Sequence, residues 1–223
     1  MPTLHALFGG SFDPVHEGHL RTAAALREHL GVAQLALLPA ARSPLKTGTT
    51  ADHHRLAMLQ LALADYPGLV IDDRELRRPP PSYTIDTLQE LRQQLGPSVP
   101  LAWVIGADTL TGLDRWKAWQ QLATLAHLLV VERPGAPWPA SGAVADWLAS
   151  LPAADKVDQL QCSPAGYWLR VVLPPQPYSS TAIRAALRQR GPDSPRPAGL
   201  PEGVWQYIRQ HHLYLSGCGH EAP

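Results

Sequence analysis

The sequence predicts an α/β fold, in which helices cover both faces of a doubly wound, mainly parallel sheet. Short apolar runs rich in Leu, Val and Ile alternate along the chain with segments whose apolar residues recur at helical spacing. This alternation is typical of strands that pair in parallel while helices cover the sheet. A chain of 223 residues, 45% of them hydrophobic, can also bury one sizeable core.

Each element is predicted from its local pattern. The strands are expected at residues 5–8, 35–38, 69–71, 101–105, 128–131 and 169–172. The helices are expected at residues 18–30, 51–64, 82–95, 180–190 and 201–212. Asp52 can cap or begin the second helix, the proline run 79–81 precedes the third, and Gly191 and Pro192 end the fourth.

Residues 1–223 are expected to form a single domain. The segment 134–166 is rich in Ala, Pro and Gly and has one short apolar patch near residues 144–151. We interpret it as a surface insertion. There is no internal repeat and no long run of charge.

Composition narrows the function classes. A net charge of +0 with 17% charged residues fits an ordinary globular protein, not a disordered chain or a polybasic nucleic-acid binder. We read no signal peptide and no apolar run long enough to span a membrane, so neither nucleic acid nor membrane is expected as a partner.

The cysteines and the tail histidines suggest no metal centre. Cys162 and Cys218 are the only cysteines and form no CxxC pair, which argues against a disulfide framework and favours a reducing cytoplasm. His211, His212 and His220 have irregular spacing around Cys218, so a frayed terminus is the preferred interpretation.

The stretch GGSFDPVHEGHL, residues 9–20, indicates a nucleotide site. It follows an apolar run, and Gly9 and Gly10 stand where a strand turns toward a helix. Glycine lets backbone N–H groups approach an anion, and a helix N-terminus adds partial positive charge. In an open α/β sheet, ligands bind at the carboxyl ends of the strands.

Familiar motifs do not account for this stretch. The patterns GxxxxGK[ST] and GxGxxG are absent, and a GxSxG nucleophile elbow fails because Asp13 replaces the last glycine. His16 and His19 are three residues apart, which puts both rings on one side of a helix start, whereas zincins need a spacing of four. From spacing alone, the two histidines could still bind zinc, or could hydrogen-bond with neighbouring residues in the core.

The string GSFDPVHEGH resembles the GxFDPxHxGH signature of nucleotidyltransferases related to class I aminoacyl-tRNA synthetases. The resemblance implies a Rossmann-like fold in which His16 and His19 lie against the phosphates of ATP and stabilise charge that develops at the α-phosphate. It also implies that backbone groups near Ser11 and Phe12 cradle phosphate and that Gly18 lets adenine or ribose approach.

Two further segments resemble the same family. YSSTAIR, residues 178–184, is similar to ISSTxxR, with Tyr178 in place of isoleucine. By itself it is typical of a capped helix start, but the resemblance implies that Ser180, Thr181 and Arg184 contact the β- and γ-phosphates.

VIGADTL, residues 104–110, matches a GxD pattern of the same family. From the segment alone, Asp108 could simply be the N-cap of a helix. The resemblance instead assigns Gly106 and Asp108 to ATP binding, with Asp108 holding the ribose.

The acceptor is indicated by PPPSYTIDTL at 79–88 and LDRWKAW at 113–119, which resemble nicotinate-nucleotide adenylyltransferases. The resemblance extends through PLKTG, RLAML, VVERPG and VWQYIRQHHLY. It implies that Tyr83 and Thr84 donate to the nicotinate carboxylate, that Trp116 stacks on the ring, and that Lys46 meets the mononucleotide phosphate. Arg133 would close over adenine or phosphate. Leu45 departs from the histidine that many relatives carry there.

The resemblance therefore implies transfer of AMP from ATP to nicotinate mononucleotide, giving nicotinate adenine dinucleotide and pyrophosphate. Mg2+ is expected to bridge the phosphates, with no dedicated metal-ligating side chain. Two alternatives stay open: an adenylyltransferase for another acceptor, such as nicotinamide mononucleotide, and a catalytically silent nucleotide sensor. ATP and nicotinate mononucleotide are the expected partners, and a monomer or small homo-oligomer is the expected assembly.

Overall fold

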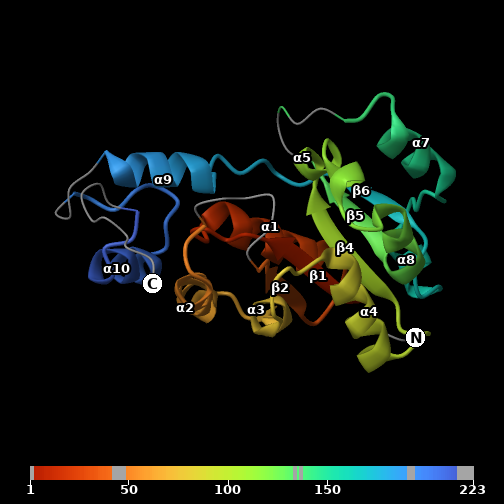
Figure 1. Ribbon diagram of the computed structural model, residues 1–223, viewed down its shortest axis with the longest axis horizontal. Coiled ribbons are helices and arrows are strands. Elements are labelled where there is room, and N and C mark those ends of the chain that lie inside the picture. The colour runs from red at the N-terminus through yellow and green to blue at the C-terminus, as the bar shows by residue number, and fades with distance from the viewer. Residues whose placement is uncertain (1–2, 42–48, 133–134, 136–137, 190–193, 215–223) are drawn as a thin grey trace.

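Six parallel strands form one sheet in the computed structural model, which describes residues 3–41, 49–132, 135, 138–189 and 194–214. The strand order is β3-β2-β1-β4-β5-β6, and every neighbouring pair is parallel (Figure 1). The strands are β1 His5–Gly10, β2 Leu35–Pro39, β3 Leu69–Ile71, β4 Leu101–Gly106, β5 His127–Val131 and β6 Trp168–Val171. All six expected strands are present, and the doubly wound class is confirmed.

The strand order places a switch point beside the first strand. The chain begins at β1 in the middle of the sheet, winds outward through β2 and β3, and then crosses back to β4 on the other side of β1. Ligands of doubly wound sheets bind in the crevice outside the carboxyl ends of the strands at such a point. The site is therefore expected just beyond Gly10 and Gly106.

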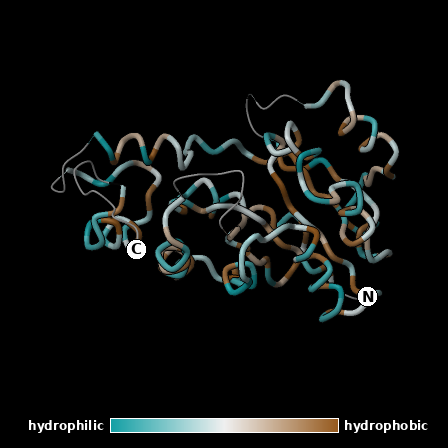
Figure 2. Tube along the Cα trace, viewed as in Figure 1, coloured by the Kyte–Doolittle hydropathy of each residue, from teal (hydrophilic) through white to brown (hydrophobic). Residues whose placement is uncertain are grey.

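Alternate residues of each strand enter two separate cores, because side chains of a strand point to opposite faces of the sheet. In β1, Ala6 and Phe8 pack into one core and Leu7 into the other. Helices α1, α2, α8, α9 and α10 contribute to the first core, and α4, α5, α6 and α7 to the second. Figure 2 shows the central strands as hydrophobic and the outer sides of many helices as hydrophilic.

The five expected helices are all present. They are α1 Glu17–His29, α2 Asp52–Ala62, α4 Thr84–Leu95, α9 Ser180–Arg188 and α10 Glu202–Gln210. The others are α3 Arg74–Arg77, α5 Ala107–Leu110, α6 Leu122–Leu125, α7 Ala143–Ser150 and α8 Val157–Gln161, too short for a clear periodic signal. None of the helices formed by the described residues is long and apolar enough to cross a membrane.

The segment 134–166, expected as a surface insertion, connects two neighbouring strands of the sheet. Its described part contains α7 and α8, and it belongs to the connection between β5 and β6, which pair in parallel. Parallel neighbours need such a crossover because a tight turn cannot join them. Trp147 and Leu148 are buried in the second core and Leu160 in the first. The Ala-, Pro- and Gly-rich composition gave no signal of the two short helices in this crossover.

Candidate active site

The two glycines that end β1 make room for two aromatic rings. A Cβ atom on Gly9 would lie 2.9 Å from the Trp103 ring, and one on Gly10 would lie 2.9 Å from the Phe12 ring. Phe12 has a φ of 46°, which is unusual for a bulky residue. The close ring packing, in addition to any approach of a phosphate, therefore requires glycine at both positions.

The two histidines of the turn lie together. His16 is the N-cap of α1 and only 4% exposed, and its ring stacks on that of His19 with the centroids 3.7 Å apart. The Phe12 ring lies edge-on to His19 at 5.0 Å. A Cβ atom on Gly18 would come within 2.9 Å of the His16 ring, so this glycine keeps the space that His16 occupies. The spacing of three residues thus brings both imidazoles to one side of the helix start, as expected.

The turn between β1 and α1 is held through its backbone carbonyl groups. Three side chains donate to three of its carbonyls: Arg55 Nη1 to Ser11 at 2.8 Å, Arg184 Nη1 to Asp13 at 2.6 Å, and Ser180 Oγ to Pro14 at 3.0 Å. Two of the donors come from α9, about 170 residues further along the chain. The SSTxxR segment therefore lies directly against the HxGH turn, as the predicted shared phosphate site requires.

The start of α9 keeps its hydroxyl groups at the turn. Ser179 is the N-cap, and its Oγ accepts from the N–H of Ala182 at 3.2 Å. Thr181 is exposed in the first turn, and its Oγ1 accepts from Arg184 Nη2 at 3.4 Å. Ser180, Thr181 and Arg184 are thus brought to one helix end, whose N–H groups favour an anion.

A cavity of about 690 Å³ opens beside this turn, at the carboxyl ends of β1 and β4. Its volume is within the usual range for a small-molecule site. Seven of the expected site residues line it: Gly9, Gly10, Ser11, Tyr83, Thr84, Asp108 and Trp116. The cavity therefore brings four expected ATP residues and three expected acceptor residues together from segments that are far apart in sequence. The histidine pair and the α9 residues are not among those that line it.

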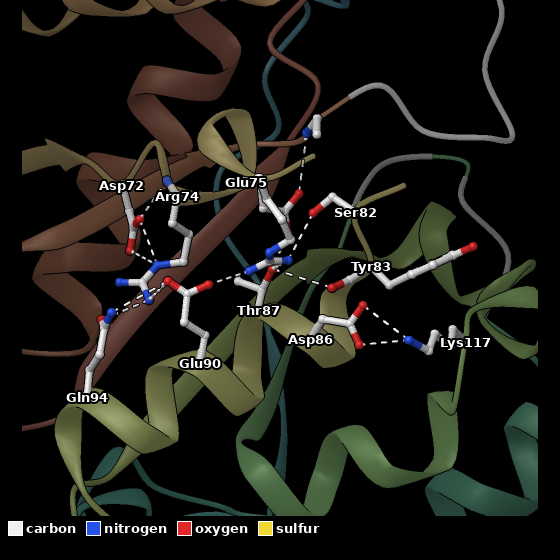
Figure 3. A network of polar contacts seen from close by, with 12 residues as sticks. Asp72, Arg74, Glu75, Ser82, Tyr83, Asp86, Thr87, Glu90, Gln94 and Lys117 are labelled. Atoms are coloured by element: carbon white, nitrogen blue, oxygen red, sulfur yellow. Dashed lines mark hydrogen bonds and ion pairs between the residues drawn. The ribbon is translucent and has the colours of Figure 1, made fainter. Parts of the chain in front are cut away.

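The start of α4 and the loop that carries Trp116 are joined across the cavity. Tyr83 is the N-cap of α4 and Thr84 is its first residue. Lys117 Nζ pairs with the Asp86 carboxylate at 2.9 and 3.2 Å and lies 4.9 Å from the centre of the Tyr83 ring (Figure 3). The half-buried Trp116, next to Lys117, is thereby held near the backbone N–H groups at the start of α4.

A buried carboxyl group supports the same wall of the cavity. Glu75 is 5% exposed and accepts from Thr87 Oγ1 at 2.7 Å and from the N–H of Ala41 at 3.4 Å (Figure 3). Arg78 donates to Ser82 Oγ and Thr87 Oγ1, both at 3.1 Å. Burial raises the pKa of Glu75 above its usual value. Glu75 thus connects α4 to the segment that follows β2.

Of the remaining residues expected at or beside the site, the structure describes two and leaves three outside the described ranges. Gly106 ends β4 as the N-cap of the short helix α5, and Asp108 is exposed at the cavity. Lys46, Leu45 and Arg133 fall outside the described residues, so their assignments stay predictions. Within the described ranges, no group of three or more His, Cys, Asp or Glu residues is arranged to hold a metal ion.

Sequence reasoning missed several residues that shape the site. Arg55, which is fully buried, lies in the RLAML segment that resembles the family, but nothing in that pattern revealed its hold on Ser11. Tyr214 ends the VWQYIRQHHLY segment and donates to the Asp13 carboxyl group at 2.5 Å. Glu75 gave no signal, because one acid among arginines reads as a solvated surface charge.

Comparison with known proteins agrees with this geometry. Residues 7–186 match the family model described as cytidylyltransferase-like, which defines the protein as a nucleotidyltransferase. A protein of Stenotrophomonas maltophilia named "Probable nicotinate-nucleotide adenylyltransferase" is 48% identical over 97% of this chain and 99% of its own length. One of the same name from Laribacter hongkongensis is 45% identical over 94% of both chains.

The chain therefore belongs to the nicotinate-nucleotide adenylyltransferase family. Among solved structures, nicotinic acid mononucleotide adenylyltransferase of Plasmodium falciparum in complex with NaAD has the same fold. Its TM-score is 0.71 at 17% identity, and the match covers 95% of this chain and 97% of that one.

Proposed function

We propose that the turn after β1 and the adjoining cavity transfer AMP from ATP to nicotinate mononucleotide, giving nicotinate adenine dinucleotide and pyrophosphate. One observation carries this proposal. Ser11 lines the cavity that contains Tyr83 and Trp116, and the same turn leads directly to the histidine pair and α9. Residues suited to each substrate thus lie on one turn and in the cavity beside it.

ATP would lie along the turn with its phosphates toward α9. His16, His19 and Arg184 would stabilise the charge that develops on the phosphates, and the start of α9 would receive the pyrophosphate through Ser180 and Thr181. Four ATP residues that line the cavity would then hold the rest of the nucleotide: Gly9, Gly10, Ser11 and Asp108. Phe12, Gly18 and Gly106, which do not line it, would shape the turn and the end of β4 beside the nucleotide. Asp108 is exposed at the cavity and can accept hydrogen bonds from ribose hydroxyls.

The acceptor would occupy the wall formed by α4 and the Trp116 loop. Trp116 is half-buried at the cavity, which leaves ring surface for stacking on nicotinate. The first N–H groups of α4, beside Tyr83 and Thr84, favour the negative charge of the nicotinate carboxylate. An amide in its place has no charge to offer to this helix end.

The chemistry requires no protein nucleophile. An oxygen of the acceptor phosphate forms a bond to the α-phosphorus of ATP, while the bond from that phosphorus to the bridging oxygen breaks and pyrophosphate leaves with the electron pair. The attacking phosphate is already ionised near neutral pH and needs no strong base. Catalysis then consists of positioning and charge stabilisation. Mg2+ would be supplied with ATP and would offset the negative charge of its phosphates, and this scheme assigns it no protein ligand.

The experiment is pyrophosphate release from MgATP, with nicotinate and nicotinamide mononucleotides offered in parallel. We expect a higher kcat/KM for the nicotinate form. Preference for the amide would contradict the carboxylate site at Tyr83 and Thr84 but not the adenylyl transfer. No release with either acceptor, together with measurable ATP binding, would favour a sensor. Location in the cytoplasm and the oligomeric state stay predictions.

A further inference from the structure

The Asp13 side chain is an anchor inside the turn that precedes the histidines. It is 5% exposed, and its two carboxyl oxygens accept from Tyr214 Oη at 2.5 Å and from the N–H of Thr50 at 3.3 Å. A buried carboxyl group requires such donors because it has lost its contacts with water. The strongest of them, judged by distance, comes from a residue 201 positions away in the sequence.

The backbone after α10 places Tyr214 beside the Asp13 side chain. Leu213 is 1% exposed in the first core, and its N–H donates to the carbonyl of Ile208 at 3.0 Å. The residues on either side of it, His212 and Tyr214, have φ values of 51° and 63°. Left-handed backbone is unfavourable for such residues and persists only where surrounding contacts impose it. The core contact of Leu213 and the bond from Tyr214 to Asp13 supply those contacts.

The Tyr214 hydroxyl remains a donor over the working pH range. Burial is the main cause that raises its pKa, and the neighbouring Asp13 raises it further. Its ring also packs against the first core. The contact with Asp13 is therefore a fixed part of the fold.

A short series of contacts leads from this anchor to the catalytic histidines. Asp13 follows Phe12 directly, and the Phe12 ring lies against His19, which stacks on His16. The backbone carbonyl of Asp13 also accepts from Arg184. A displacement of Asp13 would thus move both the histidine pair and the arginine that we assign to ATP. Small misplacements of catalytic groups cost large factors in rate.

We propose that Tyr214 is a positioning residue for adenylyl transfer, which holds Asp13 and thereby aims the His16–His19 pair and Arg184 at the phosphates. The proposal rests on the function proposed above. Tyr214 touches neither substrate in this scheme, so its effect should appear in kcat with little change in the KM for ATP.

The test compares Tyr214→Phe with Tyr207→Phe. Tyr207 is a matched control because its hydroxyl also bonds across to another element, to His54 Nδ1 at 2.9 Å, but does not contact the turn. Both variants keep the ring and lose a hydroxyl that bonds to another part of the chain, so a drop in Tm of about 2–4 °C is expected for each. We expect kcat to fall about tenfold in Tyr214→Phe only, with the KM for ATP changed less than threefold. An equal loss of kcat in both variants, or none in Tyr214→Phe, would overturn the proposal.

A second variant tests whether the two residues act as one unit. Asp13→Ala removes both acceptor oxygens and leaves no amide to bond with Tyr214. If Tyr214 works through Asp13, then Tyr214→Phe added to Asp13→Ala should cause no further loss of kcat. If the two losses of kcat multiply in the double variant, Tyr214 does not act through Asp13.

The NMR signals of the histidine rings separate this proposal from the function itself. We expect the His16 and His19 signals to shift in Tyr214→Phe and to stay unchanged in Tyr207→Phe, where the His54 signal should move. Unmoved His16 and His19 signals in Tyr214→Phe would overturn the positioning role. This readout needs no turnover, so it applies even if the wild-type protein releases no pyrophosphate from nicotinate mononucleotide and MgATP.

Discussion

His16 and His19 illustrate what a single residue can reveal in a sequence. Their spacing predicted that both rings lie on one side of a helix start, and the rings do stack at 3.7 Å. Spacing alone left zinc binding and core packing open, because each of these also places two imidazoles together. The surrounding GxFDPxHxGH pattern, rather than the pair itself, favoured a role at the phosphates of ATP.

Replacing His19 by alanine tests the charge-stabilising role. We expect kcat to fall by about 100-fold or more, because a preorganised group that stabilises transition-state charge is lost. His29→Ala is a matched control, since His29 is an exposed residue on the same helix and should leave turnover nearly unchanged. Steady-state pyrophosphate release measures both variants, and circular dichroism verifies the fold. A His19→Ala enzyme with full turnover would contradict the role.

Replacing Trp116 by alanine tests the acceptor pocket. Loss of ring stacking worth about 1–3 kcal/mol should raise the KM for the acceptor roughly 5- to 150-fold. Trp119→Ala is the comparison, because Trp119 lies 5.1 Å from Trp147 in an edge-to-face contact and should mainly affect stability. Substrate titrations of each variant separate the two KM values. A change confined to the KM for ATP would place Trp116 elsewhere in the site.

At the scale of elements, the wall of the cavity depends on contacts that no local pattern predicts. Glu75 in α3 joins Thr87 in α4 to Ala41 after β2. Lys117 and Asp86 tie the Trp116 loop to the same helix. Each partner is an ordinary polar residue in the sequence, so their pairing follows only from how the helices pack on the sheet.

Glu75→Gln tests this wall through the pH dependence of stability. Burial raises the pKa of Glu75 in the folded protein above the usual value of about 4.5, which the unfolded chain keeps. Between the pKa of the unfolded chain and that of the folded protein, the folded protein therefore binds more protons. The free energy of unfolding contributed by Glu75 therefore falls as the pH rises through that interval. Glutamine cannot titrate, and it places an N–H group where Glu75 accepted from a donor.

We accordingly expect Glu75→Gln to be less stable than wild type at pH 4.5 and the difference to shrink as the pH rises. Urea unfolding of both proteins at several pH values measures this difference. A difference that grows with pH would mean that the folded state favours the ionised carboxylate, contrary to the assigned cause.

At the scale of the whole molecule, the strand order decides where the site lies. β1 and β4 are neighbours in the sheet, although about 90 residues separate them in the sequence. Their carboxyl ends bring the β1 turn, the start of α4 and the Trp116 loop around one cavity. α9 and the chain after α10 then reach the turn from the far end of the sequence.

Ligand-induced stabilisation tests this assembly as one unit. A ligand present at 100 times its Kd should add about 2.7 kcal/mol to the free energy of unfolding. For a chain of this size that corresponds to a rise in Tm of roughly 5–11 °C. Nicotinate mononucleotide should give a larger shift than nicotinamide mononucleotide at equal concentration in a thermal-unfolding scan. The reverse order would contradict the carboxylate pocket.

The sequence by itself determined the α/β class, the six strands, the five longer helices and the HxGH and SSTxxR segments. These features depend on apolar periodicity, punctuation by glycine and proline, and short motifs, all of which are local. Only the tertiary structure decided that 134–166 contains the crossover between β5 and β6, because its helices are too short to show a period. It alone also placed Arg55, Glu75 and Tyr214. Their roles arise from hydrogen bonds between residues that are distant in sequence, and such bonds leave no trace in local composition.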